Sequence, residues 1–179
     1  MSAAHRLRVV LLLWKPRVES DPGDVTTAGL PYVLQVQLSD DATRWEPPGV
    51  VVRPGEPVSA AAARVADALG IVLPNVRRVL ALDERPAAPG LPAETVLLVD
   101  GGWCTDADAV EVPPCPCAHE RGCQHRRRWV TAEEACGTDA ALAVGLGAAV
   151  GVAPALMVGR GEPSGPVGGD GGTRPGRGG

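Results

Sequence analysis

Five side chains that can bind a transition metal lie within one short stretch of the chain. They are Cys115, Cys117, His119, Cys123 and His125. Structural zinc is usually held by four sulfur and nitrogen ligands of these types in a tetrahedral arrangement. The spacing here, C-x-C-x-H-x3-C-x-H, is tighter than in common zinc modules. The pattern predicts either a structural Zn²⁺ site or a surface segment whose thiols are incidental.

Arginines beside this stretch change the chemistry that it could support. They are Arg121, Arg126, Arg127 and Arg128. Guanidinium groups oppose a metal cation, but they can lower the pKa of neighbouring thiols or contact the phosphates of a substrate. The chain has five cysteines, and its short N-terminal apolar run is interpreted as a strand rather than a secretory signal. We therefore expect reduced thiols or a bound metal in a cytoplasmic protein, not a disulfide framework.

Charge and hydropathy exclude several classes of function. The 179 residues carry a formal net charge of -4 with scattered arginines, which disfavours general nucleic-acid binding. No window of about 18 apolar residues predicts a transmembrane helix. We therefore expect no nucleic-acid partner and no membrane association. The sequence does not specify an oligomeric state.

The elements that must position reactive side chains begin with two strands and a helix. Residues 9–14 form an apolar run of strand length, and residues 32–38 alternate apolar and polar side chains. Residues 45–56 are expected to form a loop. Over residues 58–69 the apolar side chains recur at helical spacing, and Gly70 follows as a C-terminal stop.

The second half of the chain predicts further strands and a terminal helix. Residues 79–82 and 95–99 have the composition of strands, and residues 129–130 predict a short one. Thr131 with Glu at position 134 is a capping-box pattern that predicts a helix start. Residues 140–150 predict the last helix, although two glycines weaken it.

This order of elements is typical of an α+β fold in a single domain. The domain is expected over residues 1–157, with a Cys/His/Arg-rich loop at residues 104–128. Residues 158–179 are rich in Gly and Pro and are expected to form a disordered tail, because such a composition buries too little apolar surface.

The segment from residue 45 to residue 71 resembles the signature of Nudix hydrolases. Trp-Glu-Pro-Pro-Gly at residues 45–49 is followed by Pro-Gly-Glu at residues 54–56, and the next helix closes with Leu-Gly-Ile at residues 69–71. The family box reads G-x5-E-x7-R-E-U-x-E-E-x-G-U, where U is an apolar aliphatic residue. The resemblance extends over roughly residues 6–150. It implies a Nudix-like α/β/α sandwich with a mixed β-sheet.

The resemblance also implies an activity. Nudix hydrolases cleave a diphosphate bond in a nucleoside diphosphate derivative, with Mg²⁺ or Mn²⁺ neutralising the charge that develops. Here Glu56 and Asp67 take the places of metal ligands, and Glu56 and Arg64 those of catalytic residues. The implied substrate-binding residues are Gly49, Gly55 and Trp45, and Trp45 could stack on a base or simply pack. The implied partner is a nucleotide-like small molecule.

The helix departs from the family pattern after Arg64. Glu56 and Arg64 keep the family spacing, but residues 65–69 read Val-Ala-Asp-Ala-Leu and Gly70 arrives one residue early. Counted back from Gly70 instead, Asp67 replaces one metal-binding glutamate and Glu56 falls out of register. Either alignment leaves one carboxylate on the helix at most. Two functions stay open: a divergent hydrolase, or a catalytically inactive Nudix-fold protein that binds a nucleotide or a partner, with or without a stabilising zinc.

Overall fold

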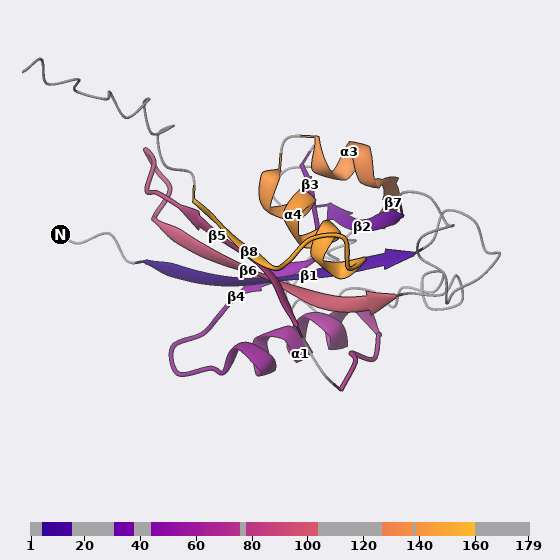
Figure 1. The fold of residues 1–179 in the computed structure, drawn as a ribbon. Coiled ribbons are helices and arrows are strands. Elements are labelled where there is room, and N and C mark those ends of the chain that lie inside the picture. The colour runs from indigo at the N-terminus through magenta and orange to yellow at the C-terminus, as the bar shows by residue number, and fades with distance from the viewer. Residues whose placement is uncertain are drawn as a thin grey trace, which may run out of the picture.

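A mixed sheet of eight strands forms the middle layer of the molecule, with helices on both faces (Figure 1). The computed structural model describes residues 5–15, 31–37, 44–75, 78–103, 127–137 and 139–159. The strands are β1 (Arg6–Lys15), β2 (Tyr32–Gln37), β3 (Trp45–Glu46), β4 (Gly49–Val51), β5 (Val79–Arg85), β6 (Glu94–Trp103), β7 (Arg127–Thr131) and β8 (Leu156–Gly159). The helices are α1 (Val58–Leu69), α3 (Ala132–Cys136) and α4 (Ala140–Ala149). This arrangement confirms the predicted α/β/α sandwich.

Along one edge, the central strand β1 pairs with two different strands, so the sheet divides into two branches there. Along the other edge it runs parallel to β6, and the sheet continues through β5 to β8. On the split edge, Arg8–Val10 pair with β4, whereas Trp14 and Lys15 pair with β2. β2 then pairs with both β3 and β7. Between the two branches, the amide of Leu11 donates to the carbonyl of Pro48 at 2.8 Å. The sheet therefore forks at the Pro47-Pro48 segment.

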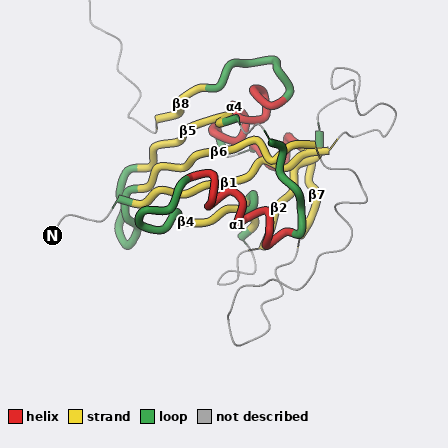
Figure 2. The backbone as a smooth tube through the Cα atoms, turned by 90° about the horizontal axis from the view of Figure 1, so that it is seen from below, coloured by secondary structure: helices red, strands yellow, loops and turns green. Residues whose placement is uncertain are grey.

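Two hydrophobic cores lie on the two faces of β1, because side chains alternate along a strand. Val9, Leu11 and Leu13 pack against α1, and all three are fully buried. Val10, Leu12 and Trp14 face the opposite core, which the terminal helices cover. Figure 2 shows α1 crossing one face of the sheet while α4 lies on the other. Burial on both faces explains why β1 reads as a continuous apolar run.

Helix α4 lies unusually close to the sheet. At Gly145 a Cβ atom would be 2.1 Å from Cδ2 of Leu98 on β6, so a larger residue here would require the Leu98 side chain to move. One of the two glycines that weaken the helix in the sequence thus lies directly against the sheet. Among the described residues, no helix has the length and apolar character needed to cross a bilayer.

Most predicted elements are confirmed, and several of their boundaries differ from the prediction. α1 spans residues 58–69 as predicted, and α4 lacks only the last predicted residue. Residues 45–51 are not all loop, because they contain the short strands β3 and β4. β5 and β6 are longer than predicted. β8 reaches Gly159, two residues into the predicted tail, because it pairs with β5.

Candidate functional site

The loop before α1 is built by a tight turn around Gly55. This glycine has a φ of 76°, in the left-handed region that glycine adopts at no steric cost. The Glu56 amide donates to the carbonyl of Arg53 at 3.0 Å, and the Arg53 amide donates to Oε2 of Glu56 at 2.8 Å. Upstream, a Cβ at Gly49 would lie 2.7 Å from the carbonyl oxygen of Val9, so glycine is needed for β4 to pair with β1.

The structure brings Glu56 and Arg64 together. Arg64 Nε lies 3.1 Å from Oε1 of Glu56, and Nη2 lies 2.9 Å from Oε2. Nη2 also donates to the carbonyl of Val51 at 3.0 Å. The Arg64 hydrogen bonds, with the Arg53 amide, hold the pKa of Glu56 below its usual value of 4.5. Because both carboxylate oxygens already accept hydrogen bonds, Glu56 secures the loop to the helix.

Helix α1, which follows Glu56, carries a single carboxylate, Asp67. Asp67 lies on the exposed side of the helix. Val65 and Leu69, which occupy positions after Arg64, are 3% and 6% exposed and pack in the core below α1. Within the described ranges no group of three or more His, Cys, Asp or Glu side chains could share a metal ion. The metal-binding roles of Glu56 and Asp67 therefore stay predictions, with Glu56 already paired to Arg64.

A guanidinium group from β7 occupies the C-terminal end of α1. Gly70, with a φ of 69°, ends the helix, and the Ile71 amide donates to the carbonyl of Ala66 at 3.1 Å. Arg127 donates to the next two free carbonyls, those of Leu69 at 3.2 Å and Ala68 at 3.3 Å. A cation is favourable here because helix C-termini carry partial negative charge. Sequence reasoning assigned Arg127 only to thiols or phosphates and missed this role.

Trp45, a predicted substrate-binding residue, carries an arginine on its ring. The guanidinium carbon of Arg128 lies 4.5 Å from the ring centroid. Arg128 also donates to Oε1 of Gln35 at 3.2 and 2.9 Å and pairs with Glu134 at 3.2 Å. This cation–π contact ties β3 to β7. Arg128 thus packs against the Trp45 ring, and the substrate-binding role of Trp45 stays a prediction.

A small hollow opens where the sheet forks, on the face covered by α4. Its volume is about 70 Å³. An apolar floor and roof come from Val10, Val96, Leu98, Ala141 and Leu142, and charged walls come from Arg8, Glu46, Asp83, Arg85 and Asp139, with Pro47 at the fork. No motif marks this site, because its lining comes from elements spread over most of the described chain.

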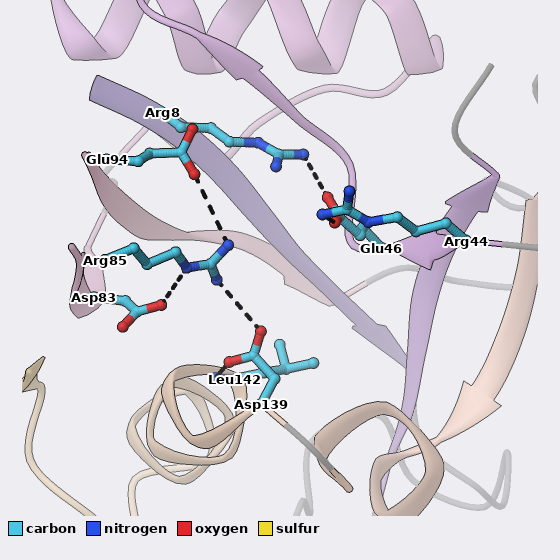
Figure 3. Close-up of polar contacts among 8 residues, drawn as sticks. All are labelled: Arg8, Arg44, Glu46, Asp83, Arg85, Glu94, Asp139 and Leu142. Carbon is cyan, nitrogen blue, oxygen red and sulfur yellow. Dashed lines mark hydrogen bonds and ion pairs between the residues drawn. The ribbon is translucent and has the colours of Figure 1, made fainter. Parts of the chain in front are cut away.

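Two arginines anchor the walls of this hollow (Figure 3). Arg8 Nη2 lies 2.8 Å from Oε2 of Glu46, and Arg44 also pairs with Glu46. Burial raises the pKa of Glu46, but Arg8 and Arg44 outweigh burial and hold it below its usual value. The second anchor, Arg85, comes from β5.

Arg85 lies among three carboxylates from three different elements. Its Nε is 2.6 Å from Oδ2 of Asp83, which is only 1% exposed. Its Nη1 is 3.9 Å from Oε2 of Glu94, and its Nη2 is 3.5 Å from Oδ2 of Asp139. Asp139 also caps α4, because its Oδ1 accepts from the amide of Leu142 at 3.1 Å. The network thus joins β5, β6 and the start of α4.

The predicted zinc ligands lie outside the described residues. They are Cys115, Cys117, His119, Cys123 and His125. Of the flanking cysteines, Cys136 is described and is half-buried. Burial, with the nearby Asp139 and Glu133 carboxylates, raises its pKa to about 11, so this thiol stays protonated at neutral pH.

Solved structures identify the fold. No family model and no curated protein matches the sequence. The MutT protein of Methanosarcina mazei Go1 superposes with a TM-score of 0.52 at 17% identity, over 83% of this chain and 92% of that chain. A MutT/nudix family protein of Enterococcus faecalis gives 0.50 at 17% identity, over 73% of this chain and 45% of that chain. The chain has the Nudix fold.

A third Nudix structure was solved with a ligand. The NUDIX domain of Shewanella oneidensis NrtR, complexed with ADP ribose, superposes with a TM-score of 0.50 at 14% identity. The match covers 73% of this chain and 75% of that domain. NrtR itself has also been solved with a 27mer DNA. This Nudix-fold chain spans less than half of the E. faecalis protein, and at these identities the comparisons establish shared architecture.

Proposed function

We propose that this Nudix-fold chain binds a nucleoside diphosphate derivative without hydrolysing it. The observation that carries the proposal is the state of Glu56, whose two carboxylate oxygens accept hydrogen bonds from Arg64 and the Arg53 amide. Apolar side chains at positions 65, 66, 68 and 69 leave Asp67 as the one carboxylate on α1. A loop and helix arranged in this way can shape a ligand site without assembling a metal centre.

The choice of ligand class rests on the fold and on the hollow. ADP ribose, bound by the NrtR domain, is a nucleoside diphosphate derivative. The hollow beside Pro47 combines an apolar floor with polar walls, which is the usual composition of small-molecule sites. The acidic net charge of -4 favours a small ligand over a nucleic acid for this chain.

A divergent hydrolase is the second candidate, because Glu56 and Arg64 retain the family spacing and meet in space. One or two carboxylates can hold Mg²⁺ when substrate phosphates supply the other oxygens. In that case Glu56 would have to release Arg64 and act with Asp67. Hydrolysis therefore predicts a strict dependence on both Mg²⁺ or Mn²⁺ and the Glu56 carboxylate.

The two candidates are separated by measuring binding and turnover together. Purified protein is titrated calorimetrically with ADP ribose and nucleoside diphosphates, in chelator and then in Mg²⁺ or Mn²⁺, while chromatography follows product release. Metal-independent binding with no turnover is the expected result. Metal-dependent turnover that disappears in Glu56→Gln would replace the proposal with the hydrolase. Absence of binding across the panel would remove the ligand-binding proposal itself.

A further inference from the structure

We propose that the hollow under α4 receives the amino-bearing edge of a nitrogen heterocycle, so that the chain prefers amino-substituted bases over their oxo counterparts. This inference rests on the proposed function and specifies its ligand. It concerns the hollow lined by Asp83, Arg85 and Asp139, which is separate from the loop around Glu56.

Hydrogen-bond acceptors outnumber donors on one wall of the hollow. Asp83 and Asp139 line this wall and, together with Glu94 outside the hollow, converge on the single guanidinium of Arg85. An ionised carboxylate accepts hydrogen bonds at several lone-pair positions and donates none. At Asp139, the guanidinium and the amide of Leu142 do not fill all these positions. A ligand that complements this wall must bring N–H donors of its own.

The contact distances show where acceptor capacity remains. Arg85 is bonded closely only to Asp83, at 2.6 Å, whereas its Nη2 stands 3.5 Å from Oδ2 of Asp139. A charge-assisted N–H···O bond is typically about 2.7–2.9 Å long. Oδ2 of Asp139 is therefore held by Arg85 through charge and not through a close hydrogen bond. This atom is the acceptor best placed to meet a ligand N–H.

The opposite wall offers no comparable excess. Glu46 accepts from Arg8 at 2.8 Å and also pairs with Arg44. Two guanidinium groups thus face one carboxylate there. Two arginines, Arg8 and Arg85, and three carboxylates, Glu46, Asp83 and Asp139, line the hollow itself, so its lining is nearly balanced in charge. A neutral ring suits this lining better than a phosphate group, which would face the Asp83 and Asp139 carboxylates.

The size of the hollow limits what enters it. A volume of about 70 Å³ is far below the roughly 300–1,000 Å³ of sites that enclose whole ligands. It suits the edge of a ring that carries an exocyclic amino group, with the remainder of the nucleotide outside. An oxo group in the same place would direct its lone pairs at carboxylate oxygens. Such a mismatch costs affinity because two acceptors then face each other with no proton between them.

The test compares nucleotides that differ by this one group. Calorimetric titrations in chelator with ADP against IDP, and with CDP against UDP, replace an amino group by an oxo group and change the adjacent ring nitrogen. We expect the amino nucleotides to bind roughly tenfold or more tightly than their partners. In Asp139→Asn the ratio should fall to about threefold or less, since the amide presents a donor as well as an acceptor.

Asp139→Asn separates recognition from folding because Asn caps helices as well as Asp does. Asp139→Ser provides a second uncharged cap if the amide variant is unstable. The matched control is Glu84→Gln, a neighbour of Asp83 that is exposed on the other side of β5, and it should leave the ratio unchanged.

Each outcome has a distinct meaning. Equal binding within each pair, or tighter binding of IDP and UDP, overturns the amino-edge inference and leaves the proposed function standing. An amino preference that survives in both Asp139 variants overturns its assignment to this hollow. If none of the four nucleotides binds, the proposed function fails, and this inference fails with it.

Discussion

Arg64 donates two hydrogen bonds to the carboxylate of Glu56, eight residues earlier in the chain. Nε lies 3.1 Å from Oε1 and Nη2 lies 2.9 Å from Oε2. The same Nη2 reaches the carbonyl of Val51, so one side chain joins β4, the loop and α1. A salt bridge in which both carboxylate oxygens are used is a geometric constraint as well as an electrostatic one. Glu56 thus has a structural role in the Nudix-like segment, and the pH dependence of stability can test this role.

Glu56→Gln should lower the melting temperature at neutral pH and lose this effect in acid. The pKa of Glu56 is held below 4.5 by Arg64 and the Arg53 amide. The stabilisation is therefore complete above the unfolded-state pKa and disappears as the pH falls through the lower folded-state pKa. Thermal melts of both proteins from pH 7 to pH 3 measure the difference. A difference that is constant over this range contradicts the assigned role, and exposed Glu84→Gln is the control.

Arg127→Gln should loosen the end of α1. The substitution removes the guanidinium that bonds the carbonyls of Leu69 and Ala68. We expect a loss of about 1–2 kcal/mol in unfolding free energy. Urea denaturation measures the change in unfolding free energy. Hydrogen exchange at the amides of Gly70 and Ile71 should accelerate more than exchange in β6. Arg127→Lys keeps the charge but not the two-pronged geometry, and should recover part of the loss. Uniform acceleration throughout the domain would show that the effect is not local.

Gly49 and Gly55 should respond differently to the same substitutions. Gly49→Ala places a methyl group against the carbonyl of Val9 and should cost about 1–3 kcal/mol of unfolding free energy. Gly49→Asn should cost at least as much, because its Cβ meets the same carbonyl. At Gly55 the added atom meets open space, but a φ of 76° strains an L-residue. Gly55→Ala should cost about 1 kcal/mol, and Gly55→Asn less, because Asn tolerates this region. Chemical denaturation of the four variants checks the pattern, and similar costs for Ala and Asn at Gly55 would contradict it.

The cysteine and histidine stretch makes a separate prediction. If Cys115, Cys117, His119, Cys123 and His125 hold a structural ion, protein purified without added metal should contain about one equivalent of zinc. Elemental analysis measures this directly, and Cys117→Ser should reduce it. A content below about a tenth of an equivalent would establish that these thiols are incidental.

Local signals explain which elements could be predicted. The boundaries of α1 follow from the helical periodicity of residues 58–69. Pro57 and Gly70 flank this segment directly in the sequence. The helix start at Thr131 follows from the capping box, and its Oγ1 indeed accepts from the Glu134 amide at 3.2 Å. Strands β3 and β4 could not be found in this way. They have two and three residues, and pairing with β2 and β1 defines them.

The candidate site was predictable only where it is local. Glu56 and Arg64 lie eight residues apart, and their family spacing singled both out, although their contact with each other was not predicted. The Arg85 network links residues from β5, β6 and α4, and depends on strand register. No local signal in the sequence marks Asp83, which is only 1% exposed in the structure. Alternation along β5 places Asp83 and Arg85 on one face, but only the tertiary packing shows which face is covered.

The contact between Arg127 and α1 also has a consequence for the order in which the chain becomes structured. A helix of 12 residues is marginal in isolation even when it is rich in alanine. The carbonyls of Ala68 and Leu69 accept hydrogen bonds from Arg127, which lies 58 residues after Leu69 in the chain. During synthesis α1 therefore emerges well before the side chain that completes its end. We expect its final turn to stay frayed until β7 has joined β2, which would couple a local helix to one of the slower, long-range steps of folding.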